Sequence, residues 1–377
     1  MPRTAPAPGV PRPHTVLVFQ GGGALGAYQA GVFEALQAQG IAPDWLVGTS
    51  IGAINASLIA GNPPSRRLER LRAFWDRVTI KGSVGLASTG LSGPWFAPWR
   101  TWQTMLSGVP GFFQPRVPAP WDLARAAPLP ELGFYDTSPL RHTLADLIDF
   151  EYLNRADTRL TLCAVNVTTG QLARFDNRHS NRPITAEHIM ASGALPPGFA
   201  PVLIDGEPYW DGGVYSNTPL DIVLDDAERR DTLCFMVDLW DASEAAPVSL
   251  GDALKRLKDI QYASRTREHI DDHERMQNLR RAVRLLGQRL APGVAKDPAV
   301  RQLLSLGSEH SIDIVHLVMK ALPGEDSFRD IDFSRDTLRA RWAAGLHDGQ
   351  RALRHGSWLT PPPDHLGMRV HTLPQEE

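Results

Sequence analysis

The stretch TVLVFQGGGALG at residues 15–26 and the stretch WLVGTSIGAINA at residues 45–56 decide the expected fold. Each begins with a short apolar run typical of a buried strand, reaches a turn containing glycine, and continues into a segment of helical character. These helical segments are Ala27–Gln39, closed by Gly40, and Ala53–Ala60. The order strand, helix, strand, helix predicts an α/β fold with a mostly parallel central sheet and helices on both of its faces.

Further elements continue this alternation. We expect helices over residues 65–80, 138–149, 184–192 and 219–225, strands over residues 159–167, 201–204 and 233–239, and a hairpin-like stretch over residues 171–176. Residues 82–133 are rich in Gly, Pro and Trp without a regular period, which indicates an insertion. Beyond residue 240 the pattern predicts a long helical stretch over 251–290, a last strand over 312–319, and a helix over 335–354 with Ser334 as its N-cap.

The composition is that of an ordinary folded protein. The chain has 377 residues, of which 42% are hydrophobic and 21% charged, and its net charge is −3. This length suits one large core with an appended part. The charge argues against a nucleic-acid partner, because binding phosphates needs an excess of Lys and Arg. The two cysteines, Cys163 and Cys234, lie in apolar runs, so we expect two separate buried thiols.

The N-terminal residues bear on location. Residues 1–13 are rich in proline and predict a flexible tail. The apolar run that follows is shorter than the roughly 7 to 15 residues of a secretory signal. No stretch approaches the roughly 18 apolar residues of a membrane-spanning helix. We therefore expect a cytoplasmic protein, with contact at a membrane surface as an open alternative.

Gly48-Thr49-Ser50-Ile51-Gly52 matches a nucleophile elbow, the tight turn from a strand into a helix that presents a serine hydroxyl. Small residues flank the serine in such turns because larger ones would clash. The turn would place Ser50 at the carboxyl edge of the sheet and beside a helix N-terminus, which favours developing negative charge. The pattern has only three fixed positions, so the flanking strand and helix carry much of its weight.

Gly21-Gly22-Gly23-Ala24-Leu25-Gly26 offers successive backbone N–H groups that little side-chain bulk obstructs, as an oxyanion hole requires. A rival interpretation is a dinucleotide-binding loop, because the run also satisfies G-x-G-x-x-G between a strand and a helix. That interpretation requires an Asp or Glu at the carboxyl end of the second strand. Gly48-Thr49-Ser50 stands there instead, and Asp44 lies at the opposite end of that strand. The oxyanion hole is therefore favoured.

Asp211-Gly212-Gly213, taken alone, would be an ordinary turn with Asp as its cap. Together and in this chain order, however, the glycine loop, the serine elbow and this turn resemble the signature of the patatin-like phospholipase family. The resemblance includes Ala53–Ala56, Ala191–Pro197 and Ser216–Pro219, and covers roughly residues 15–225. It implies a three-layer α/β/α sandwich.

The resemblance also implies a chemistry. Ser50 would be the nucleophile and Asp211 the general base of a Ser-Asp dyad that hydrolyses acyl esters. The backbone N–H groups of Gly22, Gly23 and Ala24 would form the oxyanion hole. Leu25 departs from the family, since many relatives carry Arg or Lys at this position. The resemblance therefore does not support a role here for a cation near the oxyanion.

The resemblance further implies an organisation. A catalytic domain would occupy residues 14–240, with a cap-like insertion at about 82–133. Residues 241–377 resemble the C-terminal extension of some bacterial patatin-like proteins, here mainly helical, and the role of this extension does not follow from its residues.

A histidine could instead complete a Ser-Asp-His triad, since His142, His179 and His188 lie within the core segment. Position argues against this alternative. In α/β-hydrolases the nucleophile comes well into the sheet, whereas Ser50 follows only the second predicted strand. No group of Cys, His and carboxylates has the spacing of metal ligands, so we expect an enzyme without a metal or other cofactor.

The Trp-rich segment, residues 94–121, gathers large apolar side chains among Gly and Pro, namely Trp95, Phe96, Trp99, Trp102, Met105, Phe112, Phe113 and Trp121. Two interpretations stay open: a cap buried over the acyl site, or contact with a membrane interface. Both favour an acyl-chain substrate such as a phospholipid, a lysophospholipid or a simple ester.

Other functions compete with lipid acyl hydrolysis. One is hydrolysis of hydroxyacyl esters or oligomers of bacterial storage polyester. From other classes come a nucleotide-binding oxidoreductase and a lipid-binding protein without turnover. The missing acid after the second strand argues against the oxidoreductase, and the presence of both Ser50 and Asp211 argues against an inactive protein. The oligomeric state cannot be read from the residues.

Overall fold

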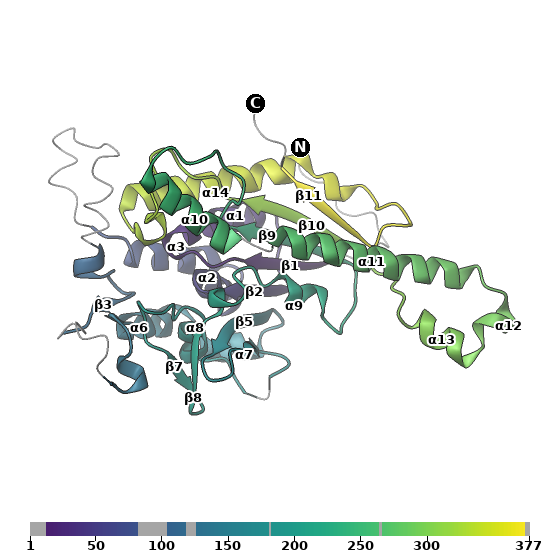
Figure 1. Cartoon of the computed structure of the whole chain (residues 1–377), viewed down its shortest axis with the longest axis horizontal. Helices are drawn as coiled ribbons and strands as arrows, with labels where there is room; N and C mark the ends of the chain where they lie inside the picture. Colours follow the sequence, from purple (N-terminus) through teal and green to yellow (C-terminus); the bar gives the residue numbers. More distant parts are fainter. Residues whose placement is uncertain (1–12, 82–103, 118–125, 181, 264–265, 374–377) are drawn as a thin grey trace.

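A computed structural model describes residues 13–81, 104–117, 126–180, 182–263 and 266–373. A central sheet lies between layers of helices (Figure 1). The predicted tail, apart from residue 13, and half of the Trp-rich segment, namely residues 94–103 and 118–121, lie outside the described residues. Within the described ranges no helix is long and apolar enough to cross a bilayer.

The sheet is mostly parallel, as the sequence predicts. Its centre is β1 (His14–Phe19), which pairs in parallel with β2 (Trp45–Thr49) on one edge and with β9 (Thr232–Asp238) on the other. β5 (Arg159–Asn166) continues the parallel order beyond β2. The carboxyl ends of β1 and β2 therefore meet at one edge, since their register places Phe19 opposite Gly48.

Antiparallel strands complete the sheet beside β5. β6 (Leu172–Asp176) pairs along one edge of β5, and β8 (Glu207–Asp211) pairs with its last residues. β7 (Val202–Ile204) then pairs with β8. A separate short ribbon joins β3 (Gln114–Pro115) to β4 (Tyr135–Asp136).

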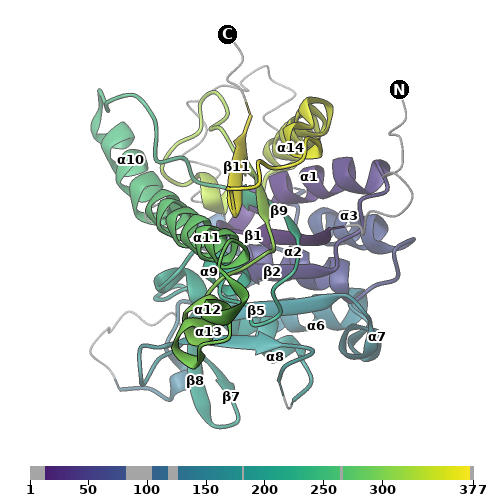
Figure 2. The same ribbon diagram turned by 90° about the vertical axis from the view of Figure 1, so that its right-hand side faces the viewer.

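The helices cover both faces of the sheet (Figure 2). Alternate residues of β1 point to opposite faces, and each set is buried: Leu17 and Phe19 belong to one apolar cluster, Val16 and Val18 to another. The helices of the first cluster are α1 (Ala27–Ala38), α2 (Ile51–Ala60), α3 (Arg67–Arg77), α6 (Ser138–Leu147), α7 (Phe150–Arg155), α8 (Ala186–Ser192) and α14 (Arg335–His355). The second face is covered by α9 (Leu220–Leu224) and α11 (Thr266–Gln288). This arrangement is the predicted three-layer sandwich.

Two buried cysteines fit the expectation from the sequence. Cys163 on β5 and Cys234 on β9 are both free thiols with no exposed surface. Burial raises the pKa of the Cys163 thiol to about 12. These thiols are therefore packing residues rather than nucleophiles.

The region after residue 240 joins the same sheet. β10 (Ile312–Val318) pairs in parallel with β9, and β11 (Met368–Thr372) pairs with β10. The expectation that 312–319 is the last strand was therefore wrong. β11 is short and only partly buried, so its local pattern is weak and its pairing with β10 defines it. The division into domains at residue 240 stays a prediction. Strands on both sides of this boundary, β9 before it and β10 after it, belong to one sheet.

The helical stretch expected over 251–290 is divided into α10 (Leu250–Ala263) and α11. Apolar residues recur through both helices, so periodicity gave no sign of the division. Two short helices, α12 (Pro292–Ala295) and α13 (Pro298–Leu304), follow α11 at the end of an arm that projects from the body (Figure 1). Ser334 precedes α14 as expected, but its side chain makes no capping hydrogen bond.

α14 packs directly against α1, and glycines permit the close approach. A Cβ atom on Gly345 would lie 2.0 Å from the carbonyl oxygen of Tyr28, and one on Gly31 would lie 2.0 Å from that of Trp342. The hydroxyl of Tyr28 also donates to Asp348 Oδ2 at 2.8 Å. The C-terminal region is therefore fixed to the first helix of the chain by backbone contact.

We expect Gly345→Ala to destabilise the protein by about 1 to 3 kcal/mol, because the added methyl group must push α14 away from α1. Urea denaturation would measure the change. Gly293→Ala on α12 is a matched control, since nothing lies within 4 Å of the added carbon. Equal midpoints for the two variants would contradict the close packing.

Candidate active site

Ser50 stands at the turn from β2 into α2 with φ 57° and ψ −126°. A positive φ is uncommon for a residue with a side chain and costs on the order of 1 to 3 kcal/mol. Hydrogen bonds hold this conformation. The N–H of Ser50 donates to the carbonyl oxygen of Ser192 at 3.0 Å and to its Oγ at 3.1 Å, while the carbonyl oxygen of Ser50 accepts from Ala53 at 2.9 Å. The strained turn directs the Ser50 side chain into a pocket.

The glycines on either side of Ser50 are required by backbone contacts. A Cβ atom on Gly48 would lie 2.5 Å from the carbonyl oxygen of Gly52. One on Gly52 would lie 2.3 Å from the carbonyl oxygen of Phe19, at the end of β1. Larger residues would therefore push the turn away from the sheet.

The register of β5 brings Asp211 to Ser50. Thr49, the last residue of β2, pairs with Cys163, and Asp211, the last residue of β8, pairs with Ala164. β6 occupies the opposite edge of β5, so β2 and β8 follow one another along a single edge. The residue after Thr49 is Ser50. Two residues far apart in the sequence thus come together because their strands end at consecutive positions of a third strand.

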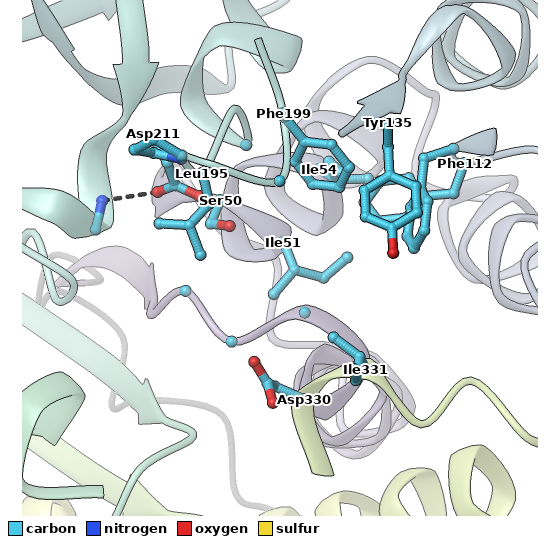
Figure 3. A pocket seen from close by; sticks show the side chains of 18 of the residues that line it. Ser50, Ile51, Ile54, Phe112, Tyr135, Leu195, Phe199, Asp211, Asp330 and Ile331 are labelled. Carbon is cyan, nitrogen blue, oxygen red and sulfur yellow. Dashed lines mark hydrogen bonds between the residues drawn. The ribbon is translucent and has the colours of Figure 1, made fainter. Parts of the chain in front are cut away.

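Asp211 is buried, with 1% of its surface exposed. Burial raises the pKa of its carboxyl to about 7, although hydrogen bonding from the Ser50 side chain and the Gly213 N–H lowers it. The Gly213 N–H donates to Oδ1 at 2.7 Å (Figure 3). A carboxyl group with this pKa is partly ionised near neutral pH and can accept a proton there.

The glycine loop passes beside Ser50. A Cβ atom on Gly21 would lie 3.0 Å from Ser50 Cβ, and Gly23 has φ 54°, which favours glycine. In the part of the chain that the structure describes, the N–H groups of Gly22 and Gly23 donate no hydrogen bond. Both residues line the pocket. Two backbone donors therefore remain available to a bound anion or carbonyl oxygen.

Buried amide side chains hold this loop, and we did not predict them from the sequence. The Gln20 side chain accepts from the N–H of Trp240 at 3.1 Å and donates to Thr218 Oγ1 at 2.8 Å. The backbone carbonyl oxygen of Gln20 accepts from Gln29 Nε2 at 2.7 Å. Asn55, on α2, donates to Gly26 and to Gln29. The sequence did offer one signal, an amide residue within an apolar segment. Such a side chain is expected to be buried, and a buried amide needs hydrogen-bond partners.

The loop is also tied to later parts of the chain. Trp240 Nε1 donates to the carbonyl oxygen of Gly21 at 2.9 Å, and Asn217 Nδ2 donates to the same oxygen at 3.2 Å. The ring of Trp240 stacks on that of Tyr262, with centroids 5.1 Å apart. The glycine loop is thus fixed by residues from Asn217 onward as well as by its own helix.

These features line one cavity of about 300 Å³ (Figure 3). Its wall is largely apolar and aromatic, as ligand sites for hydrocarbon chains are. Phe113 packs on Phe199 and on Tyr135 with ring centroids 5.2 and 4.9 Å apart. Of the predicted Trp-rich segment, Met105, Phe112 and Phe113 lie within the described residues, and all three line the cavity.

Most of the remaining predicted positions do not line the cavity. Ala24, Leu25 and Gly26 are buried in η1 (Gly23–Gly26) and are not among the lining residues. A Cβ atom on Gly212 would lie 2.6 Å from the carbonyl oxygen of Cys163, so this glycine packs against β5. Gly213 does line the cavity.

The core histidines have other partners. His142 Nδ1 lies 2.9 Å from the carbonyl oxygen of Ser138, and His188 Nδ1 lies 3.0 Å from Thr185 Oγ1. His179 lies 3.4 Å from Asp176. No histidine is among the described residues that line the cavity. Across the described ranges, no cluster of three or more His, Cys, Asp or Glu residues could hold a metal ion.

Comparison with known proteins adds relatives over part of the chain. A Caenorhabditis elegans protein named as a putative patatin-like phospholipase domain-containing protein is 44% identical over 63 residues, which is 16% of this chain and 6% of the relative. A second patatin-like phospholipase domain-containing protein of the same organism is 24% identical over 241 residues, 63% of this chain and 14% of the relative. The chain thus spans a small part of the length of either relative.

Solved structures resemble the chain more distantly. VipD from Legionella pneumophila aligns over 91% of this chain and 67% of its own, with 14% identity and a TM-score of 0.39. Human GIVD cytosolic phospholipase A2 aligns over 91% of this chain and 60% of its own, with 12% identity and a TM-score of 0.36.

Family models match most of the chain. A model described as patatin phospholipase matches residues 260–365. A model described as patatin-like phospholipase matches residues 17–224, which include the glycine loop, Ser50 and Asp211. Because this second match covers more than half of the 377 residues, the chain belongs to the patatin-like phospholipase family.

Proposed function

We propose that the protein is a lipid acyl hydrolase that cleaves carboxylic esters through a dyad of Ser50 and Asp211. One observation carries the proposal: β2, which Ser50 follows, and β8, which Asp211 ends, terminate opposite consecutive residues of β5, and Ser50 and Asp211 both line an apolar cavity. Gly22 and Gly23, whose N–H groups donate no hydrogen bond within the described residues, line the same cavity. Membership of the family indicates lipid esters as the substrate class.

In the proposed reaction, ionised Asp211 accepts the hydroxyl proton of Ser50 while Oγ attacks the ester carbonyl carbon. The carbonyl oxygen becomes an oxyanion that accepts hydrogen bonds from Gly22 and Gly23. Collapse of this intermediate releases the alcohol, which takes the proton from Asp211, and leaves an acyl group on Ser50. Water then attacks the acyl carbonyl carbon and gives a proton to Asp211. Asp211 returns this proton to Ser50 Oγ as the bond from Oγ to the acyl carbon breaks and the carboxylic acid leaves.

The environment of Asp211 suits this role. An exposed aspartate has a pKa of about 3.9 and is a weak base, whereas burial raises the pKa of Asp211 to about 7. The carboxylate is then a stronger base and is still ionised in a large fraction of molecules at neutral pH.

The cavity suits an acyl chain. Its aromatic wall, which includes Phe112, Phe113 and Phe199, can bury methylene groups. The predicted natural substrates are phospholipids, lysophospholipids or simple acyl esters, and the alternative is a hydroxyacyl ester or oligomer. Membrane contact through residues 94–121 and a cytoplasmic location also remain predictions.

We expect Ser50→Ala to lower hydrolysis of p-nitrophenyl butyrate and octanoate by at least about 10³-fold, since no other group replaces the nucleophile. A fluorophosphonate probe should label the wild type and leave this variant unlabelled. Ser57→Ala, on the same helix, is the matched control, because Ser57 Oγ bonds to the carbonyl oxygen of Ala53 outside the cavity. Full labelling of Ser50→Ala would exclude Ser50 as the nucleophile.

We expect kcat/KM to rise with pH through a single step near pH 7, because protonated Asp211 cannot accept the Ser50 proton. Initial rates between pH 5 and pH 9 with a neutral ester measure this profile. Asp211→Asn should lower the rate strongly and remove the step. A step of the same pKa in the variant would assign the titration to another group.

The stability of the protein should also depend on the ionisation of Asp211, but it should fall with rising pH where kcat/KM increases. The unfolded carboxyl has a pKa of about 3.9, and the folded one about 7, so the native state binds the proton more tightly between these values. This contribution to stability is complete below about pH 4 and is lost as the pH rises through 7. Asp211→Asn cannot ionise.

The Tm of Asp211→Asn relative to wild type should therefore increase from pH 5 to pH 8. Thermal unfolding monitored by circular dichroism measures it. Asp336→Asn, at an exposed position of α14, should show no such trend. A difference that is constant with pH would contradict the raised pKa.

A further inference from the structure

The C-terminal region supplies one wall of the cavity. The short helix η5 (Arg329–Ile331) packs on the glycine loop so closely that a Cβ atom on Gly23 would lie 2.3 Å from the carbonyl oxygen of Asp330. Asp330, Ile331 and Phe333 all line the cavity. Residues far beyond the Asp-Gly-Gly turn therefore border the place where an ester carbonyl would bind.

Asp330 gives this wall a charge. Among the described residues that line the cavity, Asp211 and Asp330 are the carboxylates, and no Lys, Arg or His is present. Lys258 Nζ, from α10, donates to Asp330 Oδ1 at 2.6 Å and to the carbonyl oxygen of Ser327 at 3.2 Å. Lys258 is not itself a lining residue. Of this ion pair, the negative residue therefore borders the cavity and the positive residue does not.

The position of Asp330 relative to the aromatic side chains indicates which part of a substrate it would face. In Figure 3 Asp330 lies beside the glycine loop, on the side of the cavity away from Tyr135 and Phe112. An acyl chain gains most by binding among the aromatic rings. The alcohol part of the ester then lies toward Asp330.

Resting on the proposed function, we propose that Asp330 is a specificity-determining residue that selects esters of uncharged alcohols over esters whose alcohol part is anionic. A negative group beside Asp330 is repelled, and the partly buried position strengthens this repulsion, since the side chains of Asp330 and Lys258 are 15% and 27% exposed. Lys258 partly cancels it. Leu25, buried behind the loop, supplies no cation that would attract an anionic group.

The test compares diacylglycerol with phosphatidylglycerol of the same acyl chains, each in neutral detergent micelles at low salt. The wild type should prefer diacylglycerol. Asp330→Asn leaves Lys258 unneutralised and should raise the relative rate on phosphatidylglycerol by about tenfold, whereas Lys258→Met leaves Asp330 unneutralised and should lower it. The double variant should return toward the wild-type ratio.

Matched controls remove charges of the same sign outside the cavity. They are Asp336→Asn on α14 and Lys320→Met, whose partner is Asp241, and both should keep the wild-type ratio. A structural role alone would lower the rates on both lipids together. Ratios that stay constant, or that move in the same direction in the two single variants, would overturn the proposal.

Labelling of Ser50 distinguishes failure of the proposed role of Asp330 from failure of the proposed function. Each variant is also treated with an uncharged fluorophosphonate, whose reaction with Ser50 should continue in Asp330→Asn and Lys258→Met. Absence of labelling and of turnover in the wild type would refute the Ser50 mechanism, and the selectivity with it. Labelling with unchanged lipid ratios would refute the role of Asp330 alone.

Discussion

The pairing of two strands along one edge of β5 is the constraint on which the site depends. β2 ends opposite Cys163 and β8 ends opposite Ala164, so the residues at their carboxyl ends are neighbours. The segment after α8 strengthens this arrangement, because Ser192 accepts from the N–H of Ser50 and Ala194 accepts from the N–H of Asp211 at 3.0 Å. A shift of β8 by one residue would turn Asp211 to the other face of the sheet.

Two unfavourable features are maintained at this point. Ser50 has a strained backbone, and Asp211 is a buried acid. Each persists because the surrounding structure fixes it: backbone hydrogen bonds hold Ser50, and the Gly213 N–H partly compensates the loss of water around Asp211. The same burial that destabilises ionised Asp211 makes it a stronger base. The cost in stability and the proposed catalytic role thus have one physical cause.

The C-terminal region belongs to the same physical unit as the site. β10 extends the sheet beside β9, α14 packs on α1 through glycine contacts, and η5 rests on the glycine loop. Trp240 further binds the loop through Gly21. Because the loop is held from both sides, the N–H groups of Gly22 and Gly23 keep their direction although they donate no hydrogen bond to any residue that the structure describes.

The sequence by itself determined the local elements and the residue types of the site. The alternation of strand and helix predicted the mostly parallel sheet, and the glycines around Ser50 and at Gly21–Gly23 predicted tight turns, because these features depend on contacts within a few residues. It did not predict β8, β11 or the division between α10 and α11, whose local patterns are short or unbroken.

Only the tertiary structure decided which side chains share the cavity. The distance between Ser50 and Asp211 depends on strand register, and the raised pKa of Asp211 depends on burial by many elements. The roles of Gln20 and Asp330 depend on side-chain partners more than 70 residues away, such as Lys258 for Asp330, so neighbouring residues in the sequence do not reveal these roles. Long-range packing sets these features, and no local pattern encodes it.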